Sequence, residues 1–562
     1  MTIHHRHAFL AACGIVALAG VPEHAGAQLN ECALIQGLGL IKAPGGCIEK
    51  SLTMQVGPGQ GDSNTPGSSA YLIARDPARA IRRGRQVFQR KFSLYEGLGP
   101  RVTADSTGDI MKTRRLGAGL SDSCAACHGR PRGSAGVGGD VATFPDSRDA
   151  PHLFGIGLIE MLGDEMTVEL RAIREQALRE ANTGIVAPAT DAAAADAARR
   201  PPTTPPRPTT VSRPLISKGV NFGRITAHPD GRVDTSEVKG VDADLRVRPF
   251  LHQGQTASLR EFLVGAFHAE MGLQAWDPVL CAATDPTAPK AAVSAGGFKY
   301  DPELDDFERP PVCTAAEDLD GDGKLSEINP ALVDYVEFYL LNYFKPGHYR
   351  ATQRTAQGVQ LMQRVGCMGC HVQNLTVRND RRIADVETSY DPERGIFNGL
   401  FAEAKPLFRS VADTAAYPKL QPLGGSFVVK DVFTDLKRHD LGPAFEERDF
   451  DGQRITSHVT EPLWGVGTTA PYGHDGRSIT LDAVIRRHGG EAASVTGAYV
   501  DLSADEQEKI IDFLQTLVLF PPDDTASNLN PGVPSSDDPQ TITNHGSINL
   551  GALFQIPGEG VE

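Results

Sequence analysis

Cys124-Ala125-Ala126-Cys127-His128 and Cys367-Met368-Gly369-Cys370-His371 are two copies of one pattern, CxxCH. The two thiols of each copy have the spacing that bonds the vinyl groups of a porphyrin, and the histidine that follows becomes the proximal iron ligand. A CxxC pair alone also fits a redox dithiol or half of a zinc site, but the histidine directly after the second cysteine in both copies favours haem. The sequence therefore predicts two covalently bound haem c groups, with His128 and His371 as iron ligands.

The sequence around the two motifs also repeats. The segment from Gly84 to Phe88 precedes the first motif as the segment from Gly358 to Met362 precedes the second, and both are typical of the N-terminal helix of a cytochrome c fold. Downstream, PFLHQG at 249–254 matches PYGHDG at 471–476, and in both a leucine follows the histidine by seven residues. Such a repeat predicts two tandem cytochrome c-like haem domains.

Helical periodicity recurs along the chain, whereas strand-like alternation is sparse. The helical stretches are 158–181, 259–271, 333–344, 481–488 and 503–519. The last stretch begins with a capping box, Ser503 with Glu506, before an apolar face. We therefore expect a mainly α fold with long loops and insertions.

The expected domain order follows from the repeat and from composition. A stretch rich in Ala, Pro and Thr, which includes RRPPTTPPRPTT, is typical of an exposed insert without a core of its own. The expected order is a signal peptide (1–27), an N-terminal extension (28–69), a first cytochrome c-like haem domain (70–280) with a Pro-rich insert (187–214), a connecting segment (281–349) with a calcium-like loop (318–329), a second cytochrome c-like haem domain (350–520) and a C-terminal tail (521–562).

The N-terminus predicts export. A basic start, the apolar stretch AFLAACGIVALAGV and the small residues Ala25-Gly26-Ala27 are typical of a secretory signal with its cleavage site. The alternative is a lipoprotein signal at Cys13, but only a short apolar run precedes that cysteine. No other segment reaches the roughly 18 uncharged apolar residues that span a membrane. We expect a periplasmic protein without a lipid anchor or a membrane span.

The charge balance and the remaining cysteines fit an exported redox protein. The 562 residues carry 55 Lys and Arg against 70 Asp and Glu, a net charge of −15, which argues against nucleic acid as a partner and suits a basic redox protein. In an oxidising compartment, Cys32 with Cys47 and Cys281 with Cys313 have spacings compatible with two local disulfides.

The two predicted haems differ in the residue that is available as the sixth ligand of the iron. At 100° per residue from Leu481, His488 falls on the inward face of its helix, so it is a candidate axial ligand of the second haem; the alternative is a packed core histidine. In the first copy, the residue at the same distance from the matched leucine is Ala266, which cannot bind iron. Glu270 follows one helical turn later and lies on the apolar face of that helix. A carboxylate there is costly unless it is functional or sits in a buried salt bridge. An open iron beside a carboxyl is what peroxide chemistry needs, which makes Glu270 the candidate catalytic acid and base.

Several blocks resemble the bacterial di-haem cytochrome c peroxidase superfamily, and more closely its di-haem oxidoreductase branch, some members of which are labelled thiol oxidoreductases. The blocks cover most of 80–515 and are DSCAACHGRP (122–131), GVGG (136–139), HLFGIGLIEML (152–162), LRVRPFLHQGQTASLREFLVGAFHAEMG (245–272), VGCMGCH (365–371) and TAPYGHDGRSITLDAVIRRHGGEA (469–492).

The resemblance implies a role for each matching residue. It places the family's catalytic glutamate on Glu270, its distal ligand of the second haem on His488, and a calcium site between the domains on Thr469 and Pro471. The family's bridging tryptophan corresponds to His252, which either replaces it in the electron relay or hydrogen-bonds a haem propionate. His152 is the nearest candidate for a displaceable ligand of the first haem.

A second calcium candidate lies in the connecting segment. In Asp318-Leu-Asp320-Gly-Asp322-Gly323-Lys324-Leu-Ser326-Glu327, carboxylates stand at positions one, three and five and glycine at six, as in oxygen-ligand calcium loops. The glutamate comes at position ten rather than twelve. The candidate calcium residues are Asp318, Asp320, Asp322, Lys324 and Glu327, and the alternative is a plain acidic turn.

Together these features predict a periplasmic di-haem c-type oxidoreductase. We expect it to reduce hydrogen peroxide at the first haem, with electrons from a small cytochrome c or cupredoxin that pass through the second haem. One alternative is a di-haem oxidase or oxygenase of an organic or protein substrate. The other is a non-enzymatic di-haem electron carrier.

Overall fold

The protein is described here from a computed structural model. The structure describes residues 57–93, 96–98, 121–130, 134–138, 140–141, 146, 148–185, 207–285, 304, 310, 312–318, 325–349, 351–390, 400–412, 418–449 and 452–519. The predicted signal peptide, the Cys32–Cys47 pair, residues 187–206 of the Pro-rich insert, Asp320, Asp322 and Lys324 of the calcium-like loop, and the C-terminal tail lie outside these residues.

The first CxxCH motif forms the short helix α6 (Cys124–His128), which packs against α4 (Pro77–Gln89), and α11 (Pro330–Leu341) packs on both α4 and α9 (Leu259–Ala269). Helix α4 starts where the Asp76 side chain accepts a hydrogen bond from the backbone N–H of Arg79, with Pro77 in the first turn. It packs against α11 at Gly84, where a Cβ would overlap the backbone oxygen of Tyr335. Glycine is therefore required at this crossing.

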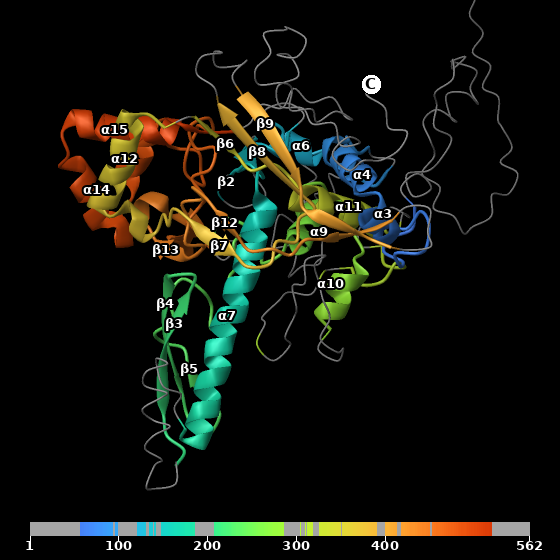
Figure 1. The fold of residues 1–562 in the computed structure, drawn as a ribbon, viewed down its shortest axis with the longest axis horizontal. Coiled ribbons are helices and arrows are strands. Elements are labelled where there is room, and N and C mark those ends of the chain that lie inside the picture. Colours follow the sequence, from blue (N-terminus) through green and yellow to red (C-terminus); the bar gives the residue numbers. More distant parts are fainter. Residues whose placement is uncertain are drawn as a thin grey trace, which may run out of the picture. The chain divides into compact units, whose positions relative to one another are not determined.

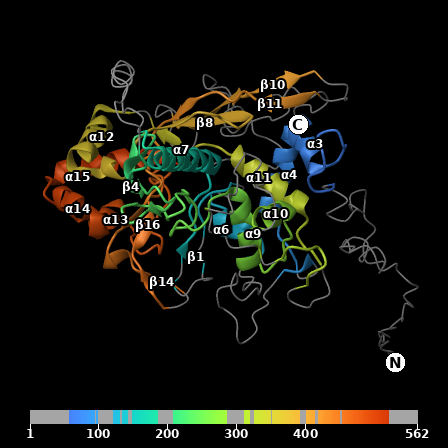
Figure 2. The ribbon, with the colours of Figure 1, turned by 90° about the horizontal axis from the view of Figure 1, so that it is seen from below.

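The second half repeats this arrangement. Helix α12 (Gln353–Val365) precedes the second motif, whose cysteine opens the short 3-10 helix η2 (Cys367–Gly369); α13 (Leu481–Arg487), α14 (Ala493–Val500) and α15 (Ala504–Gln515) follow. Helix α12 packs against α15 at Gly358, where a Cβ would overlap the backbone oxygen of Lys509. The predicted capping box at Ser503 and Glu506 is confirmed. Helices α12, α14 and α15 lie together on one side, and α3 (Ser69–Arg75), α4, α9 and α11 on the other (Figures 1 and 2).

The helix pairing differs from the expected domain order at residue 280. That boundary separates α11 from the first haem domain, yet α11 packs directly on α4 and all twelve of its residues are buried. It therefore takes the place in the first half that α15 takes in the second. The disulfide between Cys281 and Cys313 is confirmed, with 5.5 Å between the Cα atoms, and Cys281 lies in the short helix α10 (Pro278–Ala283).

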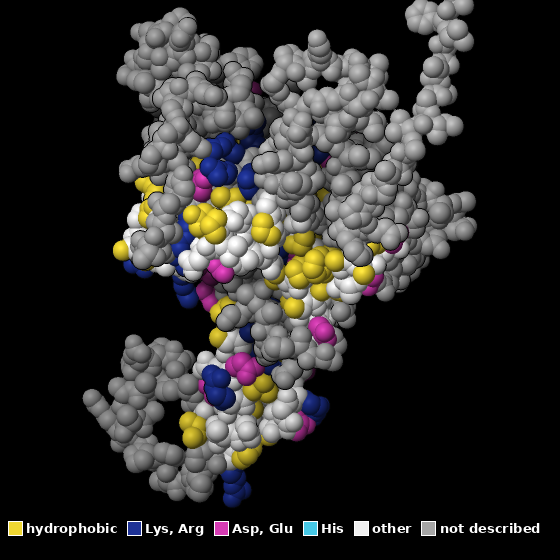
Figure 3. Space-filling model, turned by 90° about the vertical axis from the view of Figure 1, so that its right-hand side faces the viewer, with side chains coloured by type: hydrophobic (Ala, Val, Ile, Leu, Met, Phe, Trp, Pro, Cys, Tyr) yellow, Lys and Arg dark blue, Asp and Glu magenta, His cyan; other side chains and the backbone are white. Residues whose placement is uncertain are grey.

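The long helix α7 (Ile156–Thr183) carries a small sheet alongside it (Figure 1). The sheet consists of β3 (Val211–Ser217), β4 (Val220–Ala227) and β5 (Val233–Asp234), and the ion pair between Arg213 and Glu180, at 2.6 Å, joins it to the helix. The end expected for the insert, residue 214, is therefore wrong, because β3 begins at Val211, whose side chain is buried. The surface of this part mixes hydrophobic and charged side chains (Figure 3).

Short strands are more numerous than the sequence suggested, so the expectation of a mainly α fold holds only in part: the described residues contain eleven α-helices, three short 3-10 helices and seventeen strands. The largest sheet has the order β17 (Leu517–Val518), β6 (Gly347–Tyr349), β8 (Ala384–Tyr390) and β9 (Leu400–Pro406). The other pairs are β1 (Asp140–Val141) with β2 (Arg148–Asp149), β7 (Leu375–Val377) with β12 (Phe427–Val429), β10 (Phe408–Val411) with β11 (Lys419–Pro422), β13 (Arg438–Asp440) with β16 (Ser457–Val459), and β14 (Glu447–Arg448) with β15 (Arg454–Ile455).

Two groups of buried apolar side chains form the core. The larger one joins the helices of the first half to β7 and β12 of the second. The smaller one lies among α12, α13, α14 and α15. Within the described part of the chain, we find no helix long and apolar enough to cross a bilayer.

Candidate functional site

Both CxxCH motifs face one cavity. Its volume is about 1290 Å³, and Cys124, Cys127 and His128 line it together with Cys367, Cys370 and His371. Pockets for a single small molecule usually measure roughly 300–1,000 Å³. The cavity is therefore large enough for more than one ligand, and the tertiary structure brings together two motifs that are far apart in the sequence.

The two motif histidines are oriented in the same way. Nδ1 of His128 donates to the backbone oxygen of Pro151 at 2.7 Å, and Nδ1 of His371 donates to the backbone oxygen of Phe433 at 3.0 Å. Desolvation lowers the pKa of both imidazoles to about 4, so both are neutral at neutral pH. A neutral imidazole whose Nδ1–H is bound to a carbonyl presents the lone pair of Nε2, which is the form that ligates a metal.

The motif thiols complete the donor set. Burial raises the pKa of Cys124 to about 12 and that of Cys367 to about 11, so both are protonated thiols. None of the four motif cysteines is in a disulfide. Two thiols and an oriented imidazole per motif, in the wall of one cavity, are what a haem c group needs, so these residues fit two such groups.

His488 lies where the helix arithmetic predicts, in the wall of this cavity. It caps the C-terminus of α13, and its Nδ1 donates to the backbone oxygen of Val484 at 2.7 Å, which again presents Nε2. The Phe445 ring packs edge-on against it, with 5.1 Å between ring centroids. Burial and, to a smaller extent, His488 itself lower the pKa of His371. The two imidazoles therefore belong to the same part of the cavity, and ligation of iron by His488 stays a prediction.

The first half offers different side chains at the matching positions. Ala266 lines the cavity seven residues after Leu259, and Glu270 caps the C-terminus of α9. The Glu270 carboxylate lies close enough to the first motif to affect Cys127. Burial raises the pKa of the Cys127 thiol, and the negative charge of Glu270 raises this pKa further. The backbone oxygen of Glu270 accepts a hydrogen bond from the N–H of Ser121 at 3.2 Å.

Two other predicted histidines are held by hydrogen bonds at both ring nitrogens. In His252, Nδ1 contacts the carboxylate of Glu461 at 3.2 Å and Nε2 the backbone oxygen of Asp149 at 3.1 Å. In His152, Nε2 donates to the backbone oxygen of Trp464 at 2.6 Å and Nδ1 accepts the N–H of Phe154 at 3.2 Å. These bonds leave neither ring with a free nitrogen to ligate iron in this conformation.

The two calcium candidates remain predictions. Thr469 and Pro471 both line the cavity. Of the calcium-like loop, only Asp318 and residues from 325 onward are described, and the buried Glu327 carboxylate accepts a hydrogen bond from the backbone N–H of Gln274. Glu327 therefore has a hydrogen bond within the protein whether or not calcium is bound.

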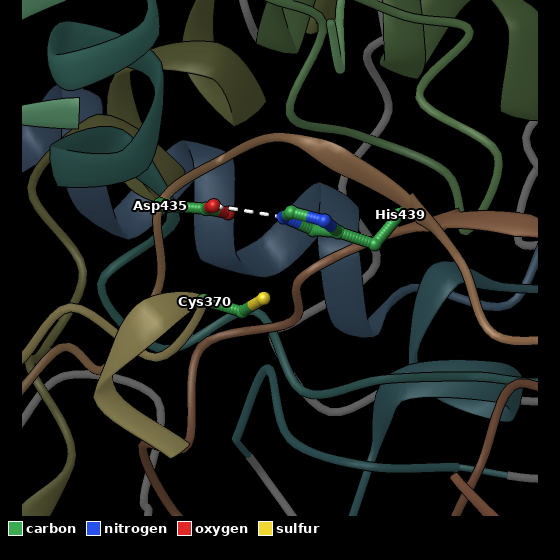
Figure 4. Close-up of side chains that lie close together, drawn as sticks. All are labelled: Cys370, Asp435 and His439. Atoms are coloured by element: carbon green, nitrogen blue, oxygen red, sulfur yellow. Dashed lines mark hydrogen bonds and ion pairs between the residues drawn. The ribbon is translucent and has the colours of Figure 1, made fainter. Parts of the chain in front are cut away.

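A charged pair beside the second motif was missed from the sequence. Asp435 and His439 are four residues apart in the sequence, and Nε2 of His439 is hydrogen-bonded to Oδ2 of Asp435 at 2.8 Å. Cys370 lies close to this pair (Figure 4). Burial disfavours the charged ring, but hydrogen bonds to Asp435, Cys370 and Glu491 raise the pKa of His439 to about 10. Both ring nitrogens face carboxylates and carry protons at neutral pH, so the ring is an imidazolium beside the second motif.

Comparison with known proteins finds a family that is similar to part of the chain. Residues 404–517 match the family described as "Di-haem oxidoreductase, putative peroxidase". The matched segment contains His439 and His488 but neither CxxCH motif. The match confirms the predicted resemblance and supports haem binding and a di-haem redox function. No curated protein matches the sequence.

Two solved structures are similar to parts of the chain. Hydrazine synthase of Kuenenia stuttgartiensis shares 14% identity over 34% of this chain and 57% of that chain, with a TM-score of 0.20. A MauG-like protein associated with microbial copper homeostasis shares 17% identity over 52% of this chain and 78% of that one, with a TM-score of 0.22. The chain thus spans less than two thirds of the hydrazine synthase chain, and at these TM-scores neither superposition carries an argument.

Proposed function

We propose that this chain, whose residues 404–517 match di-haem oxidoreductases, is an exported di-haem c-type peroxidase. Haem c attached at Cys124 and Cys127 would be the site of peroxide reduction, and haem c attached at Cys367 and Cys370 would supply the electrons. A small cytochrome c or cupredoxin in the periplasm would be the donor. The observation that carries this proposal is the asymmetry of the cavity wall: His488 in the second half, and Ala266 with Glu270 in the first.

The asymmetry favours different roles for the two halves. In the second half, Nδ1 of His371 and Nδ1 of His488 are both bound to backbone oxygens, so the Nε2 atoms of both rings would be available to hold the iron of the second haem. In the first half, His128 would hold the iron, and the matching residue Ala266 has a methyl group that cannot ligate, so a position at that iron would be left for a substrate. A plain electron carrier would fill that position, which makes the carrier alternative the weaker one.

Glu270 is the proposed proton carrier. Haem iron, when bound, supplies the position where a peroxide binds and the electrons that its O–O bond takes up. The Glu270 carboxylate would accept a proton from one oxygen of the peroxide and return it to the other, leaving oxygen, so that water would depart rather than hydroxide. Its place at the end of α9, close to Cys127, puts the carboxylate beside the first motif.

The test compares two glutamates of the same helix in the holoprotein. Glu270→Gln removes the proton carrier and should lower peroxide turnover with a reduced cytochrome donor by roughly 10²–10⁴-fold. The matched control is Glu261→Gln, because Glu261 lies in the same helix and its Oε2 accepts backbone N–H groups in the cap of α9, that of Ala257 among them, which a glutamine oxygen can also do. Turnover should be unchanged in the control.

Three outcomes would contradict the proposal. Unchanged turnover in Glu270→Gln would show that Glu270 is not the proton carrier. A purely low-spin paramagnetic resonance spectrum that cyanide cannot perturb would favour the electron carrier. Consumption of an organic or protein substrate, with a product other than water, would favour the oxidase or oxygenase. Calcium at Thr469 and Pro471 or at the 318–329 loop remains a proposal that elemental analysis of the holoprotein tests.

A further inference from the structure

A second group of polar side chains is buried beside the cavity. Glu447 in β14, His458 in β16 and His474 in the loop after Pro471 are 0%, 5% and 7% exposed. One ligand-type atom of each lies within 4.8 Å of the other two. We propose that these three residues bind a divalent first-row transition metal ion, in addition to any haem iron.

The two histidines have the hydrogen-bond pattern of metal ligands. Nε2 of His458 donates to the backbone oxygen of Phe445 at 2.7 Å, so its lone pair is on Nδ1. That Nδ1 and the Nδ1 of His474 are buried without a hydrogen-bond partner among the described residues. The two rings stack, with 4.2 Å between centroids and 19° between planes, so one ring has to turn about its side-chain bonds for both Nδ1 lone pairs to meet at one ion. A backbone carbonyl on one ring nitrogen typically fixes the tautomer of a ligating histidine, and a metal ion would satisfy both Nδ1 atoms.

Glu447 is held ready to act as the third ligand. Nε of Arg148 donates to its Oε1 and Nε2 of Gln253 donates to its Oε2, the latter at 2.7 Å. Each carboxylate oxygen has two acceptor sites, so each keeps one lone pair after these bonds. Arg148 also keeps the carboxylate ionised, and hydrogen-bonded carboxylates of this kind orient the first ligand sphere of metal centres.

The donor set selects the class of metal. Two imidazoles and one carboxylate suit Zn²⁺, Fe²⁺ or Cu²⁺, whereas Ca²⁺ and Mg²⁺ prefer oxygen ligands. Three protein ligands leave a fourth position for water or a small molecule. Because His458 and His474 also line the cavity, that position would open toward the cavity. The site differs from the calcium candidate at Thr469 and Pro471 in its ligands, and it does not depend on where peroxide reacts.

The test measures metal content and binding in the purified holoprotein. Total iron from elemental analysis minus haem iron from the pyridine haemochrome gives any non-haem iron, and the same analysis gives zinc and copper. After treatment with a chelator, equilibrium dialysis against Zn²⁺ should show one Zn²⁺ per chain. His458→Gln and Glu447→Gln should each weaken this binding by at least ~10-fold. Excess Ca²⁺ should not displace the bound Zn²⁺.

The control is a histidine in the other cluster. His439→Gln also replaces a buried histidine that contacts carboxylates, and it should bind Zn²⁺ as the parent protein does. Zn²⁺ should raise the melting temperature of the parent and of His439→Gln, but not of His458→Gln. If Glu447→Gln fails to fold, the Zn²⁺ affinity of His458→Gln tests the proposal by itself. The haem spectrum of His458→Gln then shows whether that variant is folded. Zn²⁺ binding of equal strength in the parent and His458→Gln, or none in the parent, would overturn the proposal.

Discussion

The two halves of the molecule share a helix framework and differ at the positions that face the cavity. Helices α4 and α11 cross at Gly84, and α12 and α15 cross at Gly358, each through a glycine that lets two backbones touch. On this common frame, the residue seven positions after the matched leucine is Ala266 in the first half and His488 in the second. The frame is thus repeated, whereas the side chain at this cavity-facing position is not.

The halves also differ in the charge beside each motif. Glu270 is close to Cys127, and the His439 imidazolium is close to Cys370. A carboxylate near the first motif suits proton transfer, and a positive charge near the second favours the reduced state of a group bound there. The difference teaches that a repeated fold can place opposite charges beside its two motifs by changing a few side chains, and under the proposed function one motif would hold the reacting centre and the other the electron store.

The largest effect is expected when the first half is made to resemble the second. Ala266→His adds an imidazole to the cavity wall of the first half and, under the proposed function, would fill the position that a substrate needs. We expect peroxide turnover to fall by at least ~100-fold while both haems stay bound. Turnover and the paramagnetic resonance of the first haem check this, and a high-spin first haem with normal turnover would show that position 266 does not face the iron.

The reciprocal change makes the second half resemble the first. His488→Ala removes the proposed axial ligand, so the second haem should become high-spin while the first keeps its spectrum. Turnover with a reduced donor should fall on the order of 10-fold, because the potential of the electron-supplying haem changes. Resonance Raman spectra of the oxidised protein measure the spin state. An unaltered spectrum of the second haem would mean that another residue is the ligand.

The shared frame is tested at the two crossing glycines. Gly84→Ala forces a methyl group onto the backbone oxygen of Tyr335, and Gly358→Ala forces one onto that of Lys509. Overpacking of this kind costs about 1–3 kcal/mol of unfolding free energy. We expect the larger loss at Gly84, because α11 is wholly buried whereas only Ile510, Phe513 and Leu514 of α15 are. Urea unfolding of the two variants compares them, with Gly425→Ala, which meets no atom within 4 Å, as control.

The smallest effect concerns the charge beside the second motif. The pKa of His439 is raised from 6.5 to about 10, so its ion pair with Asp435 contributes fully below pH 6.5 and is lost as the pH rises through about 10. His439→Gln should therefore lower the unfolding free energy at pH 7 by about 2 kcal/mol and flatten its fall toward pH 10. Urea unfolding at several pH values measures this. An equal pH slope in parent and variant would show that another group titrates.

Local patterns predicted much of the helical frame. The stretches predicted at 158–181, 259–271, 333–344, 481–488 and 503–519 correspond to α7, α9, α11, α13 and α15, with shifts of a few residues at their ends. The strands were missed because most of the seventeen are two to four residues long, too short for alternation to show. The contact of α11 with α4 was not predicted, because the residue pattern within one helix does not show which distant helix will pack against it.

The sequence by itself determined the donor atoms and their offsets: two CxxCH motifs, a histidine seven residues after Leu481 and an alanine seven residues after Leu259. These depend on spacing within one short segment, which covalent and helical geometry fix. Only the tertiary structure decided that both motifs share one cavity, that His439 is held as an imidazolium, and that Glu447, His458 and His474 meet. Those features arise from contacts between segments that the chain brings together only when it buries its core.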